Sequence, residues 1–259
     1  MTSSTIPGAD GAAEWLRTPR TISRRVRRRV WHAITPGREG SPRGRAVEAV
    51  RRAIEAHVDG QRIAEVLPEV VDRARHFERI VPRLLPSYRR FVSKVAPPSR
   101  TTSLEVASFL VALCAERAPR RVLELGTGFA SLVLRSGAIE REMEVWSIDP
   151  DAARLGRNRA FLVAEGVATE RMRAVRGDEL RLEGRFDLVV HELGPDSSGR
   201  LALAIERTAS GGFVLLDGAH DPGAEGPARN ILDSFGAEQW SLRALTRDCF
   251  GRHALLARR

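Results

Sequence analysis

The chain has 259 residues, of which 42% are hydrophobic, with two cysteines and a formal net charge of +9. This length suits one sizeable domain with an appendage, and two cysteines supply neither a disulfide framework nor a metal-binding spacing. No apolar run approaches the about 20 residues that a membrane-spanning helix needs. The first ten residues also lack the apolar core of a secretory signal, so a reduced cytoplasmic location is expected.

The positive charge comes almost wholly from arginine, because Lys94 is the only lysine. Many of these arginines alternate with Glu and Asp, as on ordinary solvated helix faces. Charge alone therefore makes nucleic acid the less favoured kind of partner.

Residues 1–44 are predicted to be a flexible tail that carries one basic amphipathic helix and ends in a linker rich in Pro and Gly. Apolar residues recur there every four positions, at Ile22, Val26, Val30 and Ile34. The arginines between Arg24 and Arg29 flank this stripe. The stripe either packs on the rest of the protein or binds a membrane surface or RNA.

Residues 45–100 are predicted to be a helical extension, because their apolar residues follow helical spacing and no strand-like alternation occurs before residue 120. Prolines should break it into short helices. They stand at Pro82, Pro86, Pro97 and Pro98. Such apolar stripes exceed what an exposed helix carries, so we expect the extension to cap a binding site or to form a dimer interface.

Residues 101–259 alternate between strand and helix signals, which predicts a doubly wound, mostly parallel sheet. Five strands are expected at residues 121–125, 144–148, 173–176, 186–190 and 212–216. Two further runs, residues 240–246 and 253–257, read as a C-terminal antiparallel hairpin that completes seven strands. Ligands of such sheets bind beyond the carboxyl ends of the strands.

The segment from Glu124 to Ser131, Glu-Leu-Gly-Thr-Gly-Phe-Ala-Ser, follows a buried strand and opens a helix. Gly126 permits a sharp turn, and Gly128 lets the backbone approach a ligand. The helix start then offers N–H groups to an anionic group. Ser131 stands where a dinucleotide-binding loop has its third glycine, and Glu124 suits a ligand that carries an ammonium group.

This motif resembles that of the class I S-adenosylmethionine-dependent methyltransferases, and the resemblance covers about residues 100–259. It implies a Rossmann-like fold, with the methionine part of S-adenosyl-L-methionine held by the glycine loop. Asp149, at the end of the second strand, would bind the ribose hydroxyls, and Asp178, after the third, would bind the adenine amino group. Two simpler roles remain open: Asp149 as a turn residue and Asp178 as a helix cap. The cofactor-binding residues expected are Glu124, Gly126, Thr127, Gly128, Ser131, Asp149, Asp178 and Glu192.

Residues 125–131 and 216–223 are most similar to small-molecule O-methyltransferases of bacterial secondary metabolism. The resemblance implies a small-molecule acceptor and a homodimer. An RNA methyltransferase and a non-catalytic cofactor-binding scaffold are the alternatives. The segment Glu192-Leu-Gly-Pro195 lacks the Pro-Pro-aromatic motif of many enzymes that methylate amino nitrogen.

Proton removal from the acceptor calls for a base near the ends of the fourth and fifth strands. His220 lies in a Gly/Pro-rich loop and is the first candidate; His191 ends an apolar strand and suits a structural role equally well. Metal-dependent members bind magnesium through carboxylates that Glu192 and Asp217 match in position. Their pattern continues with Asp or Asn where this chain has Gly218, so Asp196 or Asp221 would have to substitute.

Overall fold

The computed structural model describes residues 42–175, 182–193 and 198–259. Residues 53–259 form one compact unit, and residues 42–52 belong to a separate unit that comprises residues 1–52. The predicted basic helix between Ile22 and Ile34 lies outside the described residues.

Helices alone precede the sheet in the described part of the chain, as expected for a helical extension. They are α3 (Pro42–Val66), α4 (Pro68–Arg75), α5 (Phe77–Lys94), a short 3-10 helix (Pro98–Arg100) and α6 (Leu104–Arg117). No helix of the described residues combines the length and apolar composition that crossing a membrane requires.

Strands and helices then alternate. The strands are β1 (Arg121–Leu125), β2 (Glu144–Asp149), β3 (Met172–Ala174), β4 (Phe186–Glu192), β5 (Thr208–Asp217), β6 (Glu238–Ser241) and β7 (Leu255–Arg258). The helices are α7 (Phe129–Arg141), α8 (Ala152–Ala164), α9 (Ser198–Arg207), α10 (Pro222–Ser234) and α11 (Arg243–Thr246).

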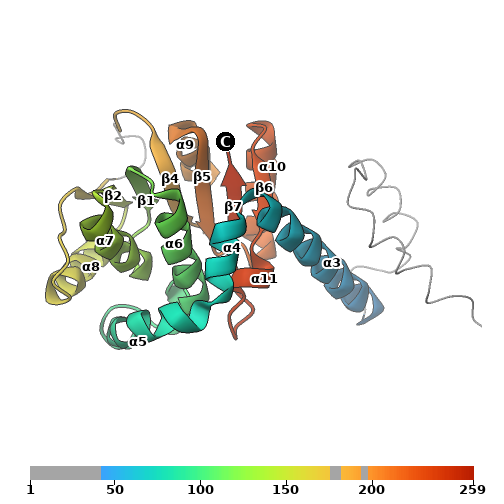
Figure 1. Ribbon diagram of the computed structural model, residues 1–259, viewed down its shortest axis with the longest axis horizontal. Coiled ribbons are helices and arrows are strands. Elements are labelled where there is room, and N and C mark those ends of the chain that lie inside the picture. The colour runs from blue at the N-terminus through green and yellow to red at the C-terminus, as the bar shows by residue number, and fades with distance from the viewer. Residues whose placement is uncertain (1–41, 176–181, 194–197) are drawn as a thin grey trace, which may run out of the picture. The chain divides into compact units, whose positions relative to one another are not determined.

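The seven strands form one sheet in the order β3-β2-β1-β4-β5-β7-β6 (Figure 1). Strands β1 to β5 pair in parallel, whereas β7 pairs antiparallel with both β5 and β6. This arrangement confirms the predicted doubly wound sheet with a C-terminal antiparallel hairpin.

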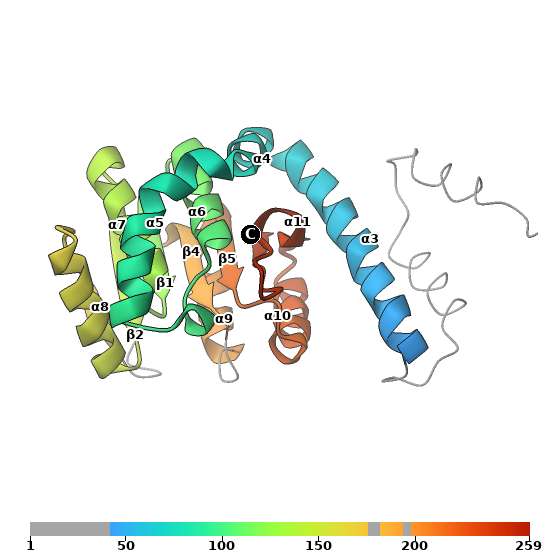
Figure 2. The ribbon, with the colours of Figure 1, turned by 90° about the horizontal axis from the view of Figure 1, so that it is seen from below.

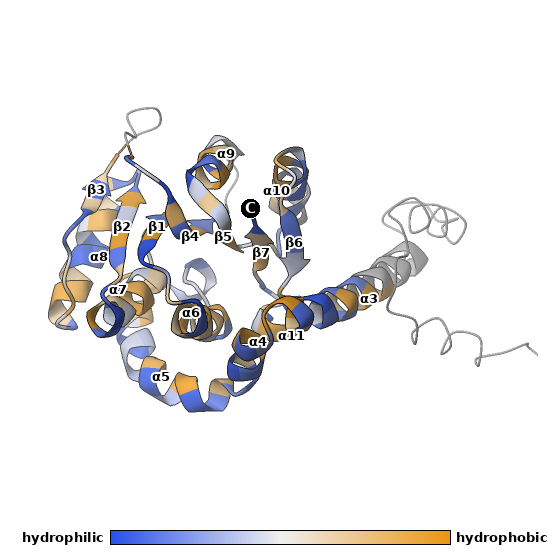
Figure 3. Cartoon of the chain, turned by 45° about the horizontal axis from the view of Figure 1, so that its top comes forward, coloured by the Kyte–Doolittle hydropathy of each residue, from blue (hydrophilic) through white to orange (hydrophobic). Residues whose placement is uncertain are grey.

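The sheet is buried between two helical layers. Figure 3 shows α9 and α10 on one face and α6 and α7 on the other. Alternate residues of each strand enter opposite cores: Val122 and Val190 pack with α6 and α7, while Leu123 and Val189 pack with α9 and α10. Because both faces are covered, the central strands are almost continuously apolar, and this pattern made them predictable.

The predicted breaks at Pro82 and Pro86 are wrong, because α5 runs through both prolines. A proline inside a helix loses one backbone hydrogen bond. Tertiary packing offsets this loss, since Phe91 near the end of α5 is 2% exposed and contacts aromatic rings of α7 and α8. Figure 2 shows α5 beside α6, α7 and α8.

Two predicted boundaries also need correction. Residues 242–246 were expected to continue a strand, but 243–246 are helix α11. Leu242 and Thr246 are both fully buried four residues apart, and the Thr246 hydroxyl donates to the Leu242 carbonyl, which suits a helical turn. At the other end of the chain, residues 42–44 were expected in a linker and instead begin α3. Proline is well tolerated in the first turn of a helix, where its missing N–H has no partner to lose.

Candidate functional site

The sheet register brings the predicted site residues to one edge. Leu125 of β1 pairs with Ile148 of β2 and with His191 of β4, which in turn pairs with Leu216 of β5. The next residue of each strand or turn therefore belongs to one row across the carboxyl ends of the sheet. That row consists of Gly126, Asp149, Glu192 and Asp217.

The glycine loop joins β1 to α7 in this row. Gly126 adopts φ +93°, a conformation that favours glycine, and its N–H donates to the Ile148 carbonyl at 2.8 Å. A Cβ on Gly126 would lie 3.3 Å from Glu192 Oε2. Gly128 has extended backbone, and a Cβ there would meet no atom within 4 Å. Space is therefore open in front of Gly128, at the start of α7.

A network of buried polar side chains is hydrogen-bonded to the glycine loop. Glu124 is fully buried and accepts from the Ser131 hydroxyl at 2.7 and 2.8 Å. Ser131 Oγ in turn accepts from the Gly128 N–H at 3.2 Å and from Asn158 Nδ2 at 3.1 Å. Asn158 Nδ2 also donates to the Gly128 carbonyl. Burial raises the pKa of Glu124 to about 7, against the lowering effect of hydrogen bonds from Ser147 and Ser131.

Asp149 is the most heavily hydrogen-bonded carboxylate of the row, and its side chain is fully buried. Its Oδ2 accepts from the Thr127 N–H and hydroxyl, both at 2.7 Å. Arg154 of α8 contacts both carboxylate oxygens, with Nε 2.8 Å from Oδ2 and Nη2 2.9 Å from Oδ1. Oδ1 also accepts from the Asp151 N–H. Asp149 therefore organises the glycine loop and pairs with an arginine in addition to ending β2.

Glu192 and Asp217 are register partners at the ends of the adjacent strands β4 and β5. Partial burial raises the pKa of Glu192, which the Arg154 charge opposes and the Asp217 charge reinforces. Burial likewise raises the pKa of Asp217, although a hydrogen bond from Thr102 lowers it. Among the described residues, no group of three or more His, Cys, Asp or Glu side chains is arranged to hold a metal ion.

Gly218 stands where the metal pattern has a carboxylate or an amide, and its conformation explains the difference. It adopts φ +90°, and a Cβ there would lie 3.2 Å from the Leu193 carbonyl oxygen. A side chain at this position would be strained. Asp221 caps α10 by accepting from the Gly223 N–H at 2.8 Å, and Asp196 lies outside the described residues.

The two histidines occupy different environments. His191 is fully buried, and its Nδ1 donates to the Leu125 carbonyl at 3.2 Å. His220 is exposed in the turn between β5 and α10. Only His220 is therefore accessible to a substrate in this structure. The catalytic role of either histidine stays a prediction.

Sequence reasoning did not identify Arg154 and Asn158. Asn158 interrupts the buried face of α8 between Leu155 and Phe161, and a polar residue at such a position is a recognisable signal. Arg154 gave no comparable signal, because arginine is common throughout the chain. Asp178 lies outside the described residues.

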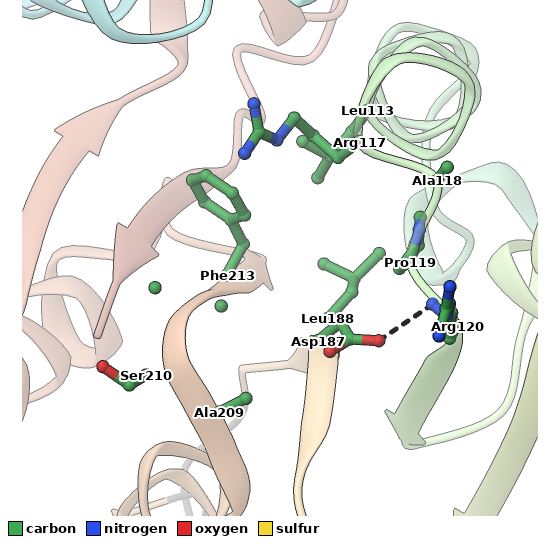
Figure 4. Close-up of a pocket in the computed structure, with 12 residues that line it drawn as sticks. Leu113, Arg117, Ala118, Pro119, Arg120, Asp187, Leu188, Ala209, Ser210 and Phe213 are labelled. Carbon is green, nitrogen blue, oxygen red and sulfur yellow. Dashed lines mark hydrogen bonds between the residues drawn. The ribbon is translucent and has the colours of Figure 1, made fainter.

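Two cavities lie away from the glycine loop. One of about 300 Å³ opens at the amino ends of β4 and β5, opposite the glycine loop, between Leu113, Arg117, Leu188 and Phe213 (Figure 4). The Arg117 guanidinium lies 5.7 Å from the centre of the Phe213 ring. Another, of about 540 Å³, lies between α5 and α8. Neither contains a predicted cofactor or catalytic residue.

No protein-family model matches this sequence, and the comparison with curated proteins finds no relative. Among solved structures, the SAH-bound methyltransferase PaMTH1 of Podospora anserina matches with a TM-score of 0.51. It is 16% identical, over 68% of this chain and 87% of its own.

Two further structures match less well. An O-methyltransferase from Bacillus cereus in complex with SAH has a TM-score of 0.45, with 15% identity over 79% of this chain and 97% of its own. TrmN from Thermus thermophilus has a TM-score of 0.49, with 22% identity over 66% of this chain and 53% of its own. The match to PaMTH1 shows that the chain has the fold of a methyltransferase.

Proposed function

We propose that this protein is an S-adenosylmethionine-dependent methyltransferase. The observation that carries the proposal is the open space in front of Gly128, at the start of α7 and beside the buried carboxylate of Asp149. A loop that approaches a ligand through its backbone needs such a space, and a helix start supplies N–H groups to it. The fold shared with an SAH-bound methyltransferase supports the same function.

The residues of this site fit the cofactor. The backbone of the Gly126–Gly128 loop would hold its methionine part, and Asp149 would accept hydrogen bonds from its ribose. Glu124 and Ser131 would not contact the cofactor, because the Glu124 side chain is fully buried. They would instead hold the loop in position through their hydrogen bonds. When bound, the cofactor supplies a methyl group on a sulfonium centre, which is reactive toward a nucleophile that approaches in line.

The variant Gly128→Val tests the cofactor site. Its backbone is extended, so valine is tolerated there, but its side chain would fill the open space. We expect S-adenosylhomocysteine (SAH), the demethylated cofactor, to bind the wild type and not the variant in isothermal titration calorimetry. The free energy of unfolding should change by less than about 1 kcal/mol.

Gly156→Val is the matched control, because Gly156 also has open space around a Cβ but lies on the exposed face of α8. It should bind SAH like the wild type. Equal SAH affinity of Gly128→Val and the wild type would disprove the assignment of the site. An absence of binding to the wild type itself would disprove the proposed function.

The finer form of the proposal is O-methylation of a small molecule. The turn after β5 brings the exposed His220 near the half-buried carboxyl of Asp217, and the two side chains interact electrostatically. This arrangement suits removal of a hydroxyl proton during transfer. Burial that raises the pKa of Asp217 also makes that carboxyl a candidate to receive the proton. The helices of residues 45–100 would cap the acceptor or form a dimer interface.

His220→Ala tests the proton-handling role. With a tritium-labelled methyl donor and a panel of small phenols and catechols, turnover should fall about 10²–10⁴-fold while SAH affinity stays near the wild-type value. EDTA with and without added magnesium, applied to the wild type, reports separately on a metal held by Glu192 and Asp217. Turnover unaffected by His220→Ala would remove the histidine from the mechanism. A protein that binds SAH but methylates no acceptor would favour the cofactor-binding scaffold.

A further inference from the structure

Asp149 has little capacity left for a ligand in this structure. Five hydrogen bonds reach its two oxygens, three from Thr127 and Asp151 and two from Arg154. A carboxylate offers about four acceptor positions. A ribose that brings two hydroxyl groups to Asp149 therefore competes with donors already present.

Of these donors, Arg154 is the one able to leave. The bonds from Thr127 and Asp151 include two backbone N–H groups that belong to the glycine loop and to the turn before α8. Arg154 contributes only its side chain, which is 35% exposed. Its backbone N–H is held separately, by the Asp151 carboxylate that caps α8 at 3.0 Å. The guanidinium can move without disturbing the loop or the helix.

A second carboxylate lies beside the arginine. Arg154 Nη1 is 3.5 Å from Oε2 of Glu192, whose side chain is 46% exposed. The guanidinium also borders the glycine loop, because a Cβ on Gly126 would lie 4.0 Å from Nη2. The side chain of Arg154 therefore contacts two acids of the row, Asp149 and Glu192.

We infer that Arg154 is an internal competitor of the cofactor. It pairs with Asp149 until the ribose hydroxyls take its place, and it then transfers to Glu192. This inference rests on the proposed function. Its physical basis is exchange: the ribose replaces two hydrogen bonds to a buried carboxylate, and the freed cation keeps an acidic partner. The affinity for the cofactor is thereby set by the strength of an ion pair within the protein.

Arg154→Leu tests the competition. Asp149 keeps three donors in this variant, so its buried charge is not left unpaired, and the fold should persist. We expect SAH to bind about tenfold more tightly in isothermal titration calorimetry, because the cofactor no longer displaces a charged donor. Arg157→Leu, on the same helix, removes the same charge away from Asp149 and should leave SAH affinity within about twofold of wild type.

The variant Glu192→Gln completes a double-mutant cycle. Without the second carboxylate the arginine stays on Asp149, so SAH affinity should fall in Glu192→Gln alone. In Arg154→Leu the same substitution should have no effect, because no arginine needs a new partner. An equal loss in both backgrounds would show that Glu192 contacts the cofactor directly and that no transfer occurs.

The outcomes separate this inference from the proposed function. Weaker or unchanged SAH binding by Arg154→Leu, beside a wild type that binds, overturns the competition and leaves the methyltransferase function in place. If neither the wild type nor Arg154→Leu binds SAH, the proposed function fails, and the inference fails with it.

Discussion

At the scale of single residues, Glu124 shows how a buried acid can be hydrogen-bonded to the glycine loop. Its carboxylate accepts a hydrogen bond from the Ser131 hydroxyl, and Ser131 Oγ accepts one from the Gly128 N–H. Two hydrogen bonds therefore link Gly128 to Glu124. The energetic consequence appears in the pKa of Glu124, which burial raises from 4.5 to about 7. A buried acid of this kind makes stability depend on pH.

The direction of this pH dependence follows from the number of protons that each state binds. Between pH 4.5 and about 7, the unfolded chain has lost the Glu124 proton while the folded protein keeps it. The folded state therefore binds more protons in this window, and stability falls as pH rises through it. The loss amounts to roughly 3 kcal/mol, from about 1.4 kcal/mol per pKa unit.

Glu124→Gln should remove this pH dependence, because an amide keeps the side chain's shape and does not ionise. We expect the unfolding free energy of the variant, relative to wild type, to rise by roughly 3 kcal/mol between pH 4.5 and pH 8. Urea denaturation followed by circular dichroism at both pH values measures it. Parallel pH profiles of the two proteins would show that Glu124 titrates normally.

Some residues of the candidate site could be predicted from the sequence, and others could not. The positions of Gly126, Gly128 and Asp149 at the carboxyl ends of the strands were predictable, because a glycine turn after a buried strand and an acid at a strand end are local patterns. Their roles toward a cofactor stay predictions. Arg154 was not, because its importance lies in a pairing with Asp149 that only the folded α8 creates. Likewise, the sequence placed Glu124 beside a ligand, whereas the fold buries it behind the loop.

At the scale of elements, α5 packs its aromatic side chains against the start of α7, directly after the glycine loop. Phe91 lies 5.6 Å from the Phe129 ring and 5.0 Å from the Phe161 ring, measured between ring centres. Phe129 directly follows Gly128 and opens α7, so the packing of α5 supports the start of that helix. Tyr88, one turn earlier on α5, contacts the Phe129 ring as well, at 5.1 Å.

Phe91→Ala should therefore destabilise the protein by about 3–5 kcal/mol, the usual loss for truncating a buried phenylalanine. Phe77→Ala is the matched control, because Phe77 begins the same helix and is 41% exposed. We expect its effect to stay below about 1 kcal/mol. Chemical denaturation of both variants measures the difference, and similar losses would mean that α5 does not anchor on α7 and α8.

The boundaries of helices and strands were predictable where the pattern of apolar residues fitted only one kind of element. The central strands β1, β4 and β5 were predictable from short apolar runs, since both sheet faces are buried there. Helix α11 was missed, because four residues are too few to separate helical from strand periodicity. The continuity of α5 through Pro82 and Pro86 was missed too, since tertiary packing, not local propensity, holds that helix together.

At the scale of the whole molecule, much of the positive charge is engaged within the protein. Several arginine side chains donate to backbone carbonyls rather than to solvent; these include Arg121, Arg135, Arg159, Arg185 and Arg259. Others pair with carboxylates, as Arg90 does with Glu165. A net charge of +9 is therefore weak support for nucleic acid as the substrate, in agreement with the composition argument.

The position of β7 has a consequence for synthesis. This strand, Leu255–Arg258, lies between β5 and β6 and supplies hydrogen-bonding partners to both. Until the ribosome has added these residues, β5 keeps one open edge and β6 has no neighbour in the sheet. Growing chains that stop short of residue 255 would thus present an unpaired strand with buried-type side chains, and such edges attract other chains. Synthesis of residues 255–258 therefore decides whether β6 can join the sheet.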